Sequence, residues 1–377
     1  MSNQLFAASI CGLLILTGCG NGAPAEMSDE LFNAFNEKDA AKIKRLIDAD
    51  ERQIGVRRNN RGDMPLHFAA ADVPEVVDYL IAKKADVNAR GYLGASPLHS
   101  AAHNGQVAAL KALLAAGASI DARDDAGFSP LQDAVMNGHM EAAAVLLDKG
   151  ADPVAVEISN NRDVAELALG RQSNPSTFAL VWSKLNAEQK KACGGRLLVV
   201  AAGNGRRDML EHILKEGVLI DSPAIGRANQ TALIAAAKEH DVGILKFLIE
   251  KGADVTAADE DGKTALHWAV WFGAIENARI LLENKTPVDA PDKFGDTALH
   301  YLAGGGMAEP AAFAFAELLL KHGANINTTN TVRGDTPRHK AAYKGRKQFM
   351  DFLSNHGADV SIRNKEGKTA DAYIEKK

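Results

Sequence analysis

The sequence of 377 residues predicts an all-α solenoid, in which short helix–turn–helix repeats stack in one direction. The segment Gly262-Lys-Thr-Ala-Leu-His-Trp-Ala returns 33 residues later as Gly295-Asp-Thr-Ala-Leu-His-Tyr-Leu, and a fixed period of this length indicates a repeat array. Apolar residues make up 46% of the chain but aromatic residues only 6%. This composition is typical of small helices packed closely in layers.

The repeated motif resembles the Thr-Pro-Leu-His-x-Ala signature of ankyrin repeats, and the period agrees with that family. The resemblance implies helix pairs joined by β-hairpin loops, with about nine to ten repeats including the caps at both ends. Each residue type has a physical reason: the hairpin glycine permits a positive φ, Thr caps the first helix, and the two ring nitrogens of His can bridge neighbouring backbone groups.

Residues 1–18 are predicted to be a lipoprotein signal peptide. They carry no charged side chain, and Leu5 to Leu16 form an apolar run that is short for a membrane span. The run ends in Leu16-Thr-Gly-Cys19, which resembles a bacterial lipobox. The resemblance implies lipidation at Cys19, a tether over residues 19–28, and a periplasm-facing protein held at the outer membrane.

An alternative location stays open. The first four residues, Met-Ser-Asn-Gln, include no Lys or Arg, whereas signal peptides usually begin with positive charge. If residues 1–18 are not a signal, the same solenoid is a cytoplasmic adaptor.

The chain then divides into blocks. Residues 29–61 show paired helical patterns without the motif, which predicts an amino-terminal capping repeat with a polar outer face. Residues 62–159 contain three clear copies that open at Gly62, Gly94 and Gly127. Residues 160–193 lose the motif and are interpreted as a degenerate repeat. There Asn174-Pro175 is a plausible helix start, with Asn as the N-cap and Pro at the first helical position.

The periodic pattern resumes over residues 194–366, with copies near Arg196, Asn229, Gly262, Gly295 and Gly334. The copy at Gly295 carries extra residues between its helices, around Gly304-Gly-Gly-Met-Ala-Glu-Pro310. Residues 367–377 begin another copy that stops after one short helix, and they are predicted to be the carboxy-terminal cap.

We expect no enzymatic activity, no cofactor and no metal. Histidines recur at one position of five repeats, but packed helices lie ~8–10 Å apart whereas zinc ligands must reach to about 2.0–2.1 Å, so one imidazole per layer does not build a site. The Gly-Lys-Thr tripeptides at 262 and 367 lack the first glycine of a phosphate loop. The recurring histidines are His67, His99, His267, His300 and His339. An enzymatic module hidden in residues 155–193 is the alternative.

The partner is expected to be another protein, bound by a monomer. Net charge is −5, which does not favour nucleic acid. By resemblance, partners of ankyrin repeats dock on the concave face, built from hairpin tips and exposed sides of first helices, and binding hot spots are rich in Trp, Tyr and Arg. Position in the repeat selects Tyr92, Leu93, Phe128, Met136, Lys263, Trp271, Phe272, Phe294, Tyr343 and Lys344.

Four of these rings, those of Trp271, Phe272, Phe294 and Tyr343, come from three successive repeats and could form one aromatic patch. A basic cluster at the carboxy-terminal end is a second candidate surface; its members are Arg333, Arg338, Lys340, Lys344, Arg346 and Lys347. The function predicted is a membrane-tethered protein-interaction module, either a scaffold or an immunity protein that blocks a toxic effector.

Overall fold

The computed structural model describes residues 26–58, 62–156, 162–170 and 174–374. The predicted signal peptide and the predicted lipidation residue, Cys19, lie outside these ranges. Within them no helix has both the length and the hydropathy that crossing a bilayer requires.

The described residues form helices joined by short turns and by hairpins, and contain no regular strand. The all-α prediction is therefore confirmed, and isolated antiparallel bridges such as Ala258 with Thr264 mark the hairpins. The elements are α1 Asp29–Asn36, α2 Ala40–Ala49, η1 Glu51–Gly55, α3 Pro65–Asp72, η3 Pro74–Val76, α4 Val77–Ala82, η4 Tyr92–Gly94, α5 Pro97–His103, α6 Val107–Ala115, α7 Pro130–Met136, α8 Met140–Asp148, α9 Val164–Leu167, α10 Pro175–Lys184, α11 Ala187–Gly203, α12 Arg207–Lys215, α13 Ala232–Ala237, α14 Val242–Glu250, α15 Ala265–Phe272, α16 Ile275–Glu283, α17 Ala298–Gly304, α18 Glu309–Lys321, α19 Pro337–Tyr343, α20 Lys347–Asn355 and η5 Ala370–Tyr373.

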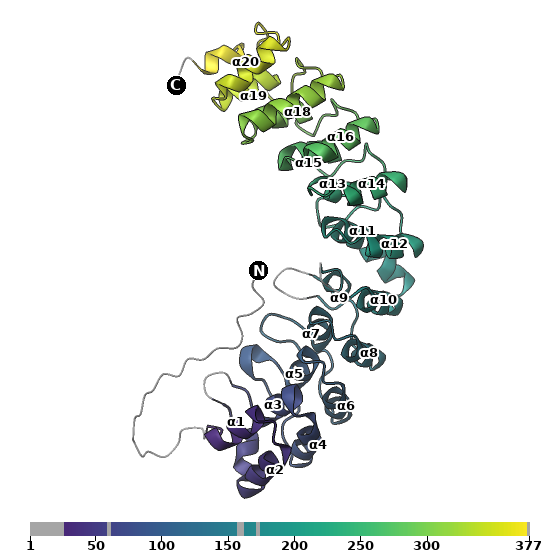
Figure 1. Ribbon diagram of the computed structural model, residues 1–377, viewed down its shortest axis with the longest axis vertical. Helices are drawn as coiled ribbons and strands as arrows, with labels where there is room; N and C mark the ends of the chain where they lie inside the picture. The colour runs from purple at the N-terminus through teal and green to yellow at the C-terminus, as the bar shows by residue number, and fades with distance from the viewer. Residues whose placement is uncertain (1–25, 59–61, 157–161, 171–173, 375–377) are drawn as a thin grey trace, which may run out of the picture.

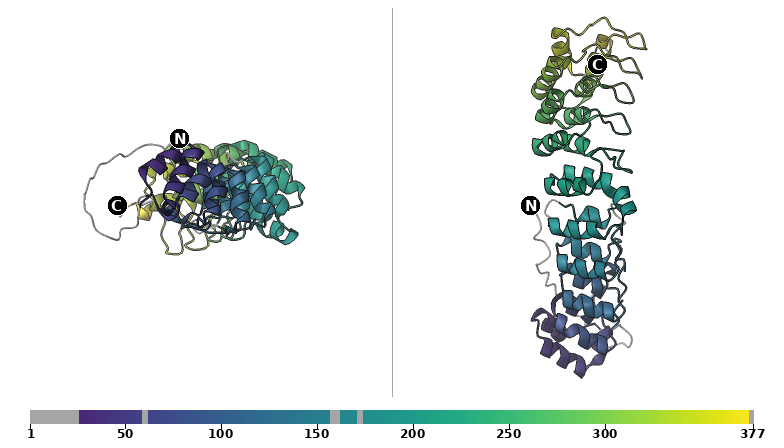
Figure 2. Two further views of the ribbon diagram at one scale, coloured as in Figure 1. Left: turned by 90° about the horizontal axis from the view of Figure 1, so that it is seen from below. Right: turned by 90° about the vertical axis from the view of Figure 1, so that its right-hand side faces the viewer.

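The helices stack into a curved array (Figure 1). The first helices of the repeats, α3, α5, α7, α9, α11, α13, α15, α17 and α19, contact one another in series. They lie on the inner side of the arc, and second helices such as α4, α6, α8 and α14 lie on the outer side. The hairpins project from one side of the stack, as the right-hand view of Figure 2 shows. First helices and hairpins therefore build the concave face.

Helix starts follow the capping chemistry of the motif. Ser96, Ser129, Thr231 and Thr336 each accept a hydrogen bond from the backbone N–H three residues later, and such a cap contributes about 1 kcal/mol. Gly262 shows why the hairpin needs glycine: its φ is 79°, and a Cβ there would lie 2.9 Å from the backbone nitrogen of Lys293.

The core is a continuous seam between the two layers of helices. Alanine and leucine fill most of it, and small alanines let adjacent first helices approach closely. The largest fully buried side chains are Trp182, Phe178, Phe247, Phe315 and Phe349. Two of these, Phe178 and Trp182, stack on each other with ring centroids 5.7 Å apart, so the degenerate segment keeps a well-packed second helix.

The middle of the array departs from the regular repeat. Helix α9 has only 4 residues, and α11 has 17. The predicted start of α10 is confirmed, with the Asn174 side chain capping the helix and Pro175 at its first position. Helix α11 begins at Ala187, so it crosses the boundary predicted at residue 193. Two buried glycines at its centre, Gly194 and Gly195, let the 218–223 loop lie directly on the helix.

Candidate functional site

The recurring histidines form hydrogen bonds that join each repeat to the next. His267 accepts a hydrogen bond at Nδ1 from the Thr264 backbone N–H, and its Nε2 donates to the Asp296 carbonyl, both across 3.1 Å. Burial lowers the pKa of His267, which keeps the ring neutral and able to play both roles. The same Nε2 bond joins His67 to Ala95, His99 to Phe128, His300 to Asp335 and His339 to Lys368. Both ring nitrogens of these histidines are therefore used in hydrogen bonds within the fold.

Four repeats have another residue at this histidine position. Gln132 reproduces the bridge with its amide, donating to the Ala155 carbonyl across 3.1 Å. Glu166 follows its cap residue Asp163 by the same three positions, as Ile234 follows Thr231. Val199 occupies the position in α11, because Asn204-Gly205 matches Asn104-Gly105. The run of Glu166, Val199 and Ile234 is the part of the concave face without an imidazole or amide bridge.

One position further along, two half-buried rings bond the hairpin of their own repeat. The Trp268 indole donates to Asp259, and the Tyr301 hydroxyl donates to Asp292. Lys263, predicted to face a partner, lies among these groups. Its side chain is 19% exposed, its Nζ is 3.2 Å from an Asp261 oxygen, and it lies over both rings at 5.2 and 5.9 Å from their centroids.

The four rings of the predicted aromatic patch are all exposed. Relative exposure is 59% for Trp271, 49% for Phe272, 45% for Phe294 and 59% for Tyr343. Each nevertheless has its own neighbour: Trp271 meets Tyr301 edge-on and Tyr343 meets Tyr373 edge-on. Among ring contacts of the described residues, none joins two of these four rings. They are separate apolar points along the concave face rather than one continuous patch.

Trp271 stands between two small hollows. One, of about 140 Å³, is lined by apolar surface of Lys263, His267, Trp268, Trp271 and Tyr301. The other, of about 60 Å³, lies against Tyr301, Leu302 and the loop at Gly305 to Met307. Trp271 is thus an exposed ring with a small hollow on each side.

The other predicted residues lie at hairpin tips and helix ends. Tyr92, Leu93 and Met136 are exposed in the first block, and Phe128 is half-buried. The Phe128 carbonyl accepts the bond from His99, which ties the hairpin down. Lys344 is exposed beside Tyr343. The first-block residues are thus separated from the Trp271 region by the degenerate repeat.

The predicted basic cluster is largely neutralised. Arg338 binds Asp371 across 2.7 Å, Lys340 binds Asp296 across 2.7 Å, and Arg346 binds Glu309 across 3.0 Å. These pairs join successive layers, so the charges of the cluster are used within the fold rather than left available for an acidic partner.

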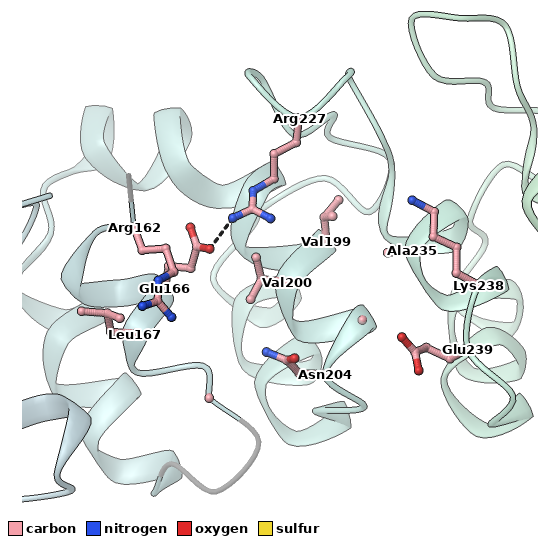
Figure 3. A pocket seen from close by; sticks show the side chains of 12 residues that line it. Arg162, Glu166, Leu167, Val199, Val200, Asn204, Arg227, Ala235, Lys238 and Glu239 are labelled. Carbon is pink, nitrogen blue, oxygen red and sulfur yellow. Dashed lines mark hydrogen bonds and ion pairs between the residues drawn. The ribbon is translucent and has the colours of Figure 1, made fainter. Parts of the chain in front are cut away.

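Sequence reasoning missed a larger hollow in the middle of the array, where α9, α11 and α13 meet (Figure 3). Its volume is about 630 Å³. Glu166 lies at one side, buried, with its carboxylate bound by both Arg196 and Arg227. The sequence does carry one signal for this hollow. Three successive repeats lack the bridging histidine and have Glu166, Val199 and Ile234 in its place.

No metal-binding cluster of three or more His, Cys, Asp or Glu side chains occurs within the described ranges. Cys193 is a buried free thiol there, and burial raises its pKa to about 11. A thiol held in its protonated form is a poor nucleophile.

Comparison with known proteins supports the fold. The model of ankyrin repeats in three copies matches residues 90–157, 197–292 and 284–364, and the single ankyrin repeat matches residues 61–92. Together these cover more than half of the chain. The gap between the matches contains the degenerate repeat.

Individual relatives are similar over part of the chain. Ankyrin repeat and SOCS box protein 16 of Homo sapiens is 32% identical over 173 residues, which are 46% of this chain and 29% of that protein. Putative palmitoyltransferase ZDHHC13 of Danio rerio is 33% identical over 46% of this chain and 26% of its own length. Putative ankyrin repeat protein FPV031 of fowlpox virus is 28% identical over 45% of this chain and 39% of its own. The chain spans less than two fifths of each of these curated relatives.

One expectation is corrected by these comparisons. The prediction that the chain is not an enzyme is contradicted, because relatives from three organisms carry the name palmitoyltransferase. That similarity covers 26% to 27% of their length. Sequence reasoning looked for catalytic motifs within this chain and had no view of the proteins in which such repeats occur.

The repeated helix pairs, the histidine bridges between hairpins and the family matches agree on one assignment. Ankyrin repeats are protein–protein interaction modules, and their concave face is the surface described above. The chain belongs to the ankyrin-repeat family.

Proposed function

We propose that this protein is a membrane-tethered ankyrin module that binds a partner protein in the bacterial envelope through the second half of its concave face. The observation that carries the binding proposal is Trp271, a ring 59% exposed between two hollows on that face. Phe272, Phe294 and Tyr343 add exposed rings along the same side. A partner that covers them gains from burying apolar surface, at about 25 cal/mol per Å².

The tether rests on the lipobox-like segment that ends at Cys19. A diacylglycerol on this residue would hold the solenoid, as a monomer, on the periplasmic side of the outer membrane, with residues 19–28 as the tether. Two roles fit a tethered binding module: a scaffold for an envelope enzyme, or an immunity protein that blocks a toxic effector. A blocker should hold one partner very tightly, and a scaffold more weakly.

The test is affinity capture from an envelope extract with residues 20–377 as bait. A second bait carries Trp271→Ala, Phe272→Ala and Tyr343→Ala. A third, a control for the loss of exposed apolar side chains elsewhere, carries Leu219→Ala and Val360→Ala; both residues are exposed in loops that follow second helices. Circular dichroism checks that all three fold alike.

We expect one protein to be retained by the wild type and the loop variant and lost by the aromatic variant. Its dissociation constant, measured with purified components, then separates the tight blocker from the weaker scaffold. A partner retained equally by all three baits would contradict the assignment to the aromatic face.

A further inference from the structure

The hollow in the middle of the concave face is a consequence of small side chains. The position four residues after the histidine position is glycine in two adjacent repeats, Gly170 and Gly203, whereas Gly304 is an isolated case and Ala71 a small one; the remaining repeats carry His103, Met136, Lys238, Trp271 and Tyr343. Gly170 and Gly203 both line the hollow. A space of about 630 Å³ is left where neighbouring repeats place large side chains, and this volume is typical of ligand-binding pockets.

The hollow has apolar side chains at its centre and charged ones at its edge. Val199 and Val200 form part of the floor, and Arg227 and Lys238 lie on opposite sides of them (Figure 3). The Asn204 amide lies below the valines and is anchored by a 3.1 Å bond to the Leu169 carbonyl. A ligand lying across the valines would meet a cation at each side, and the Glu239 carboxylate, which lines the hollow below Lys238, would direct an acidic ligand toward the upper part (Figure 3).

Arg227 is positioned by a buried carboxylate. Glu166 binds Arg196 with one oxygen and Arg227 with the other, and Arg196 also binds Asp163. These two carboxylates and two guanidiniums sum to zero charge. The Arg227 side chain is still 43% exposed, so the guanidinium is fixed in direction and open to the hollow. Arginine in this state suits recognition of a further carboxylate.

Lys238 supplies charge that this network does not balance. Its Nζ donates to the Gln230 amide oxygen across 2.7 Å and lies 4.1 Å from the centre of the Trp268 ring. Both partners are neutral. Burial and the charge of Lys263 lower the pKa of Lys238, and the Asp259 carboxylate, which makes no ion pair with it among the described contacts, opposes that shift. An ammonium ion that has lost water without gaining a carboxylate gains free energy when an anion approaches.

We propose that this hollow binds acidic side chains of an extended peptide segment, with Arg227 and Lys238 as the carboxylate-binding residues. The segment would belong to the partner protein. The Lys238 ammonium lies over the Trp268 ring, and Trp268 also lines the smaller hollow beside Trp271. The central hollow therefore adjoins the proposed binding face, and to this extent the inference rests on the proposed function.

The experiment uses fluorescein-labelled hexaglutamate as the probe and residues 20–377 as the protein. Anisotropy is measured at physiological ionic strength, with hexaglutamine as the neutral control. Attraction to the protein as a whole does not explain binding, because the formal net charge is −5. We expect saturable binding of hexaglutamate and none of hexaglutamine.

Two charge variants and one filling variant locate the site. Lys238→Gln and Arg227→Gln should each weaken hexaglutamate binding by about tenfold, the value of a charged hydrogen bond. Gly203→Met fills the hollow and leaves every charge in place; nothing lies within 4 Å of a Cβ at this glycine, so the fold can accept it. It should weaken binding by at least as much.

The matched controls are Lys246→Gln, an exposed lysine on the second helix of the same repeat, and Gly304→Met, the equivalent glycine position in α17. Both should bind like the wild type. Hexaglutamate binding should also survive in the Trp271→Ala, Phe272→Ala, Tyr343→Ala protein, which separates this site from the aromatic face. If this triple variant loses the partner protein but still binds hexaglutamate, the result supports the proposed function and leaves the hollow as a separate site.

Binding that is absent, or unchanged by Lys238→Gln and Gly203→Met, would overturn the proposal. Free glutarate provides the last arm. If it competes as tightly as hexaglutamate, the occupant is a small dicarboxylate, and the assignment to a peptide segment is wrong.

Discussion

Trp268 donates its indole N–H to the carboxylate of Asp259, nine residues earlier, across 2.9 Å. Tyr301 donates to Asp292 at the same separation, across 2.7 Å. In the repeat of α7 the equivalent position is Asp133, and the residue nine places before it is Asp124. A donor and an acceptor in two repeats are thus replaced by two carboxyl groups in a third.

This pair predicts a stability that depends on pH. Burial first, and then the charge of Asp124, raise the pKa of Asp133 from 3.8 to about 7. Because the folded-state pKa lies above the unfolded value, the stabilisation by protonated Asp133 is full below about pH 4 and is lost as pH rises through about 7. We expect Asp133→Asn to remove this dependence and to stabilise the protein by about 2 kcal/mol at pH 8 relative to the wild type.

Urea unfolding from pH 4 to pH 8 measures it. Glu141→Gln, which removes an exposed carboxylate from the following helix α8, is the control and should keep the wild-type slope. A wild-type free energy of unfolding that rises between pH 5 and pH 8 in step with Asp133→Asn would contradict the assignment.

The two halves of α11 should respond oppositely to alanine. A Cβ at Gly195 would clash with the carbonyl oxygen of Pro223 and lie 2.8 Å from that of Ser222, both backbone atoms. Gly195→Ala should therefore destabilise the protein by about 1–3 kcal/mol. Gly203→Ala, in the same helix but with open space around the Cβ, should stabilise it by about 0.5–1 kcal/mol. Thermal unfolding compares the two; equal effects would show that the close approach of the 218–223 loop costs nothing to change.

The buried network at Arg196 predicts a large effect from a single side chain. Asp163 and Glu166, with side chains 7% and 4% exposed, depend on this guanidinium. Arg196→Met leaves the buried Asp163 without its cation and Glu166 with Arg227 alone, and should cost about 3 kcal/mol. Arg207→Met removes an exposed ion pair with Glu211 and should cost less than about 1 kcal/mol. The free energies of unfolding should be measured with urea, because guanidinium chloride is a salt and would screen the ion pairs under test.

The proposed tether predicts where the protein is found in the cell. Cys19→Ser should abolish labelling by a radioactive fatty acid and move the protein from the membrane pellet to the soluble periplasmic fraction. Cys11→Ser, which changes a cysteine inside the predicted signal, should leave both unchanged. Recovery of the wild type in the cytoplasm would instead favour the adaptor alternative.

Much of the fold was predictable because each repeat contains the residues that determine its own structure. The N-caps, the hairpin glycine and the bridging histidine act within one or two layers, so the motif and its period are enough to place α15 and α17. Exposure of Trp271 and Tyr343 also followed from position in the repeat. The enclosure of Lys263 did not, because it depends on Trp268 in its own repeat and Tyr301 in the next.

The central hollow could not be read from the motif for a similar reason. It arises from what two repeats lack, Gly170 and Gly203 in place of larger residues, and from Arg227 reaching back from a later hairpin to Glu166. Pattern matching treats such segments as failures of the repeat. Their chemistry appears only when three layers are placed side by side.

The histidine bridges also bear on how the array carries force. Where His267, His300 and His339 join successive hairpins, bending the arc must stretch hydrogen bonds. Around Val199 and Ile234 this bond is missing, and the layers are joined instead by the ion pairs of Glu166 with Arg196 and Arg227. The curvature of the arc therefore depends on neutral hydrogen bonds in the second block and on charge pairs in the middle, so we expect salt and pH to act on its shape mainly at the middle.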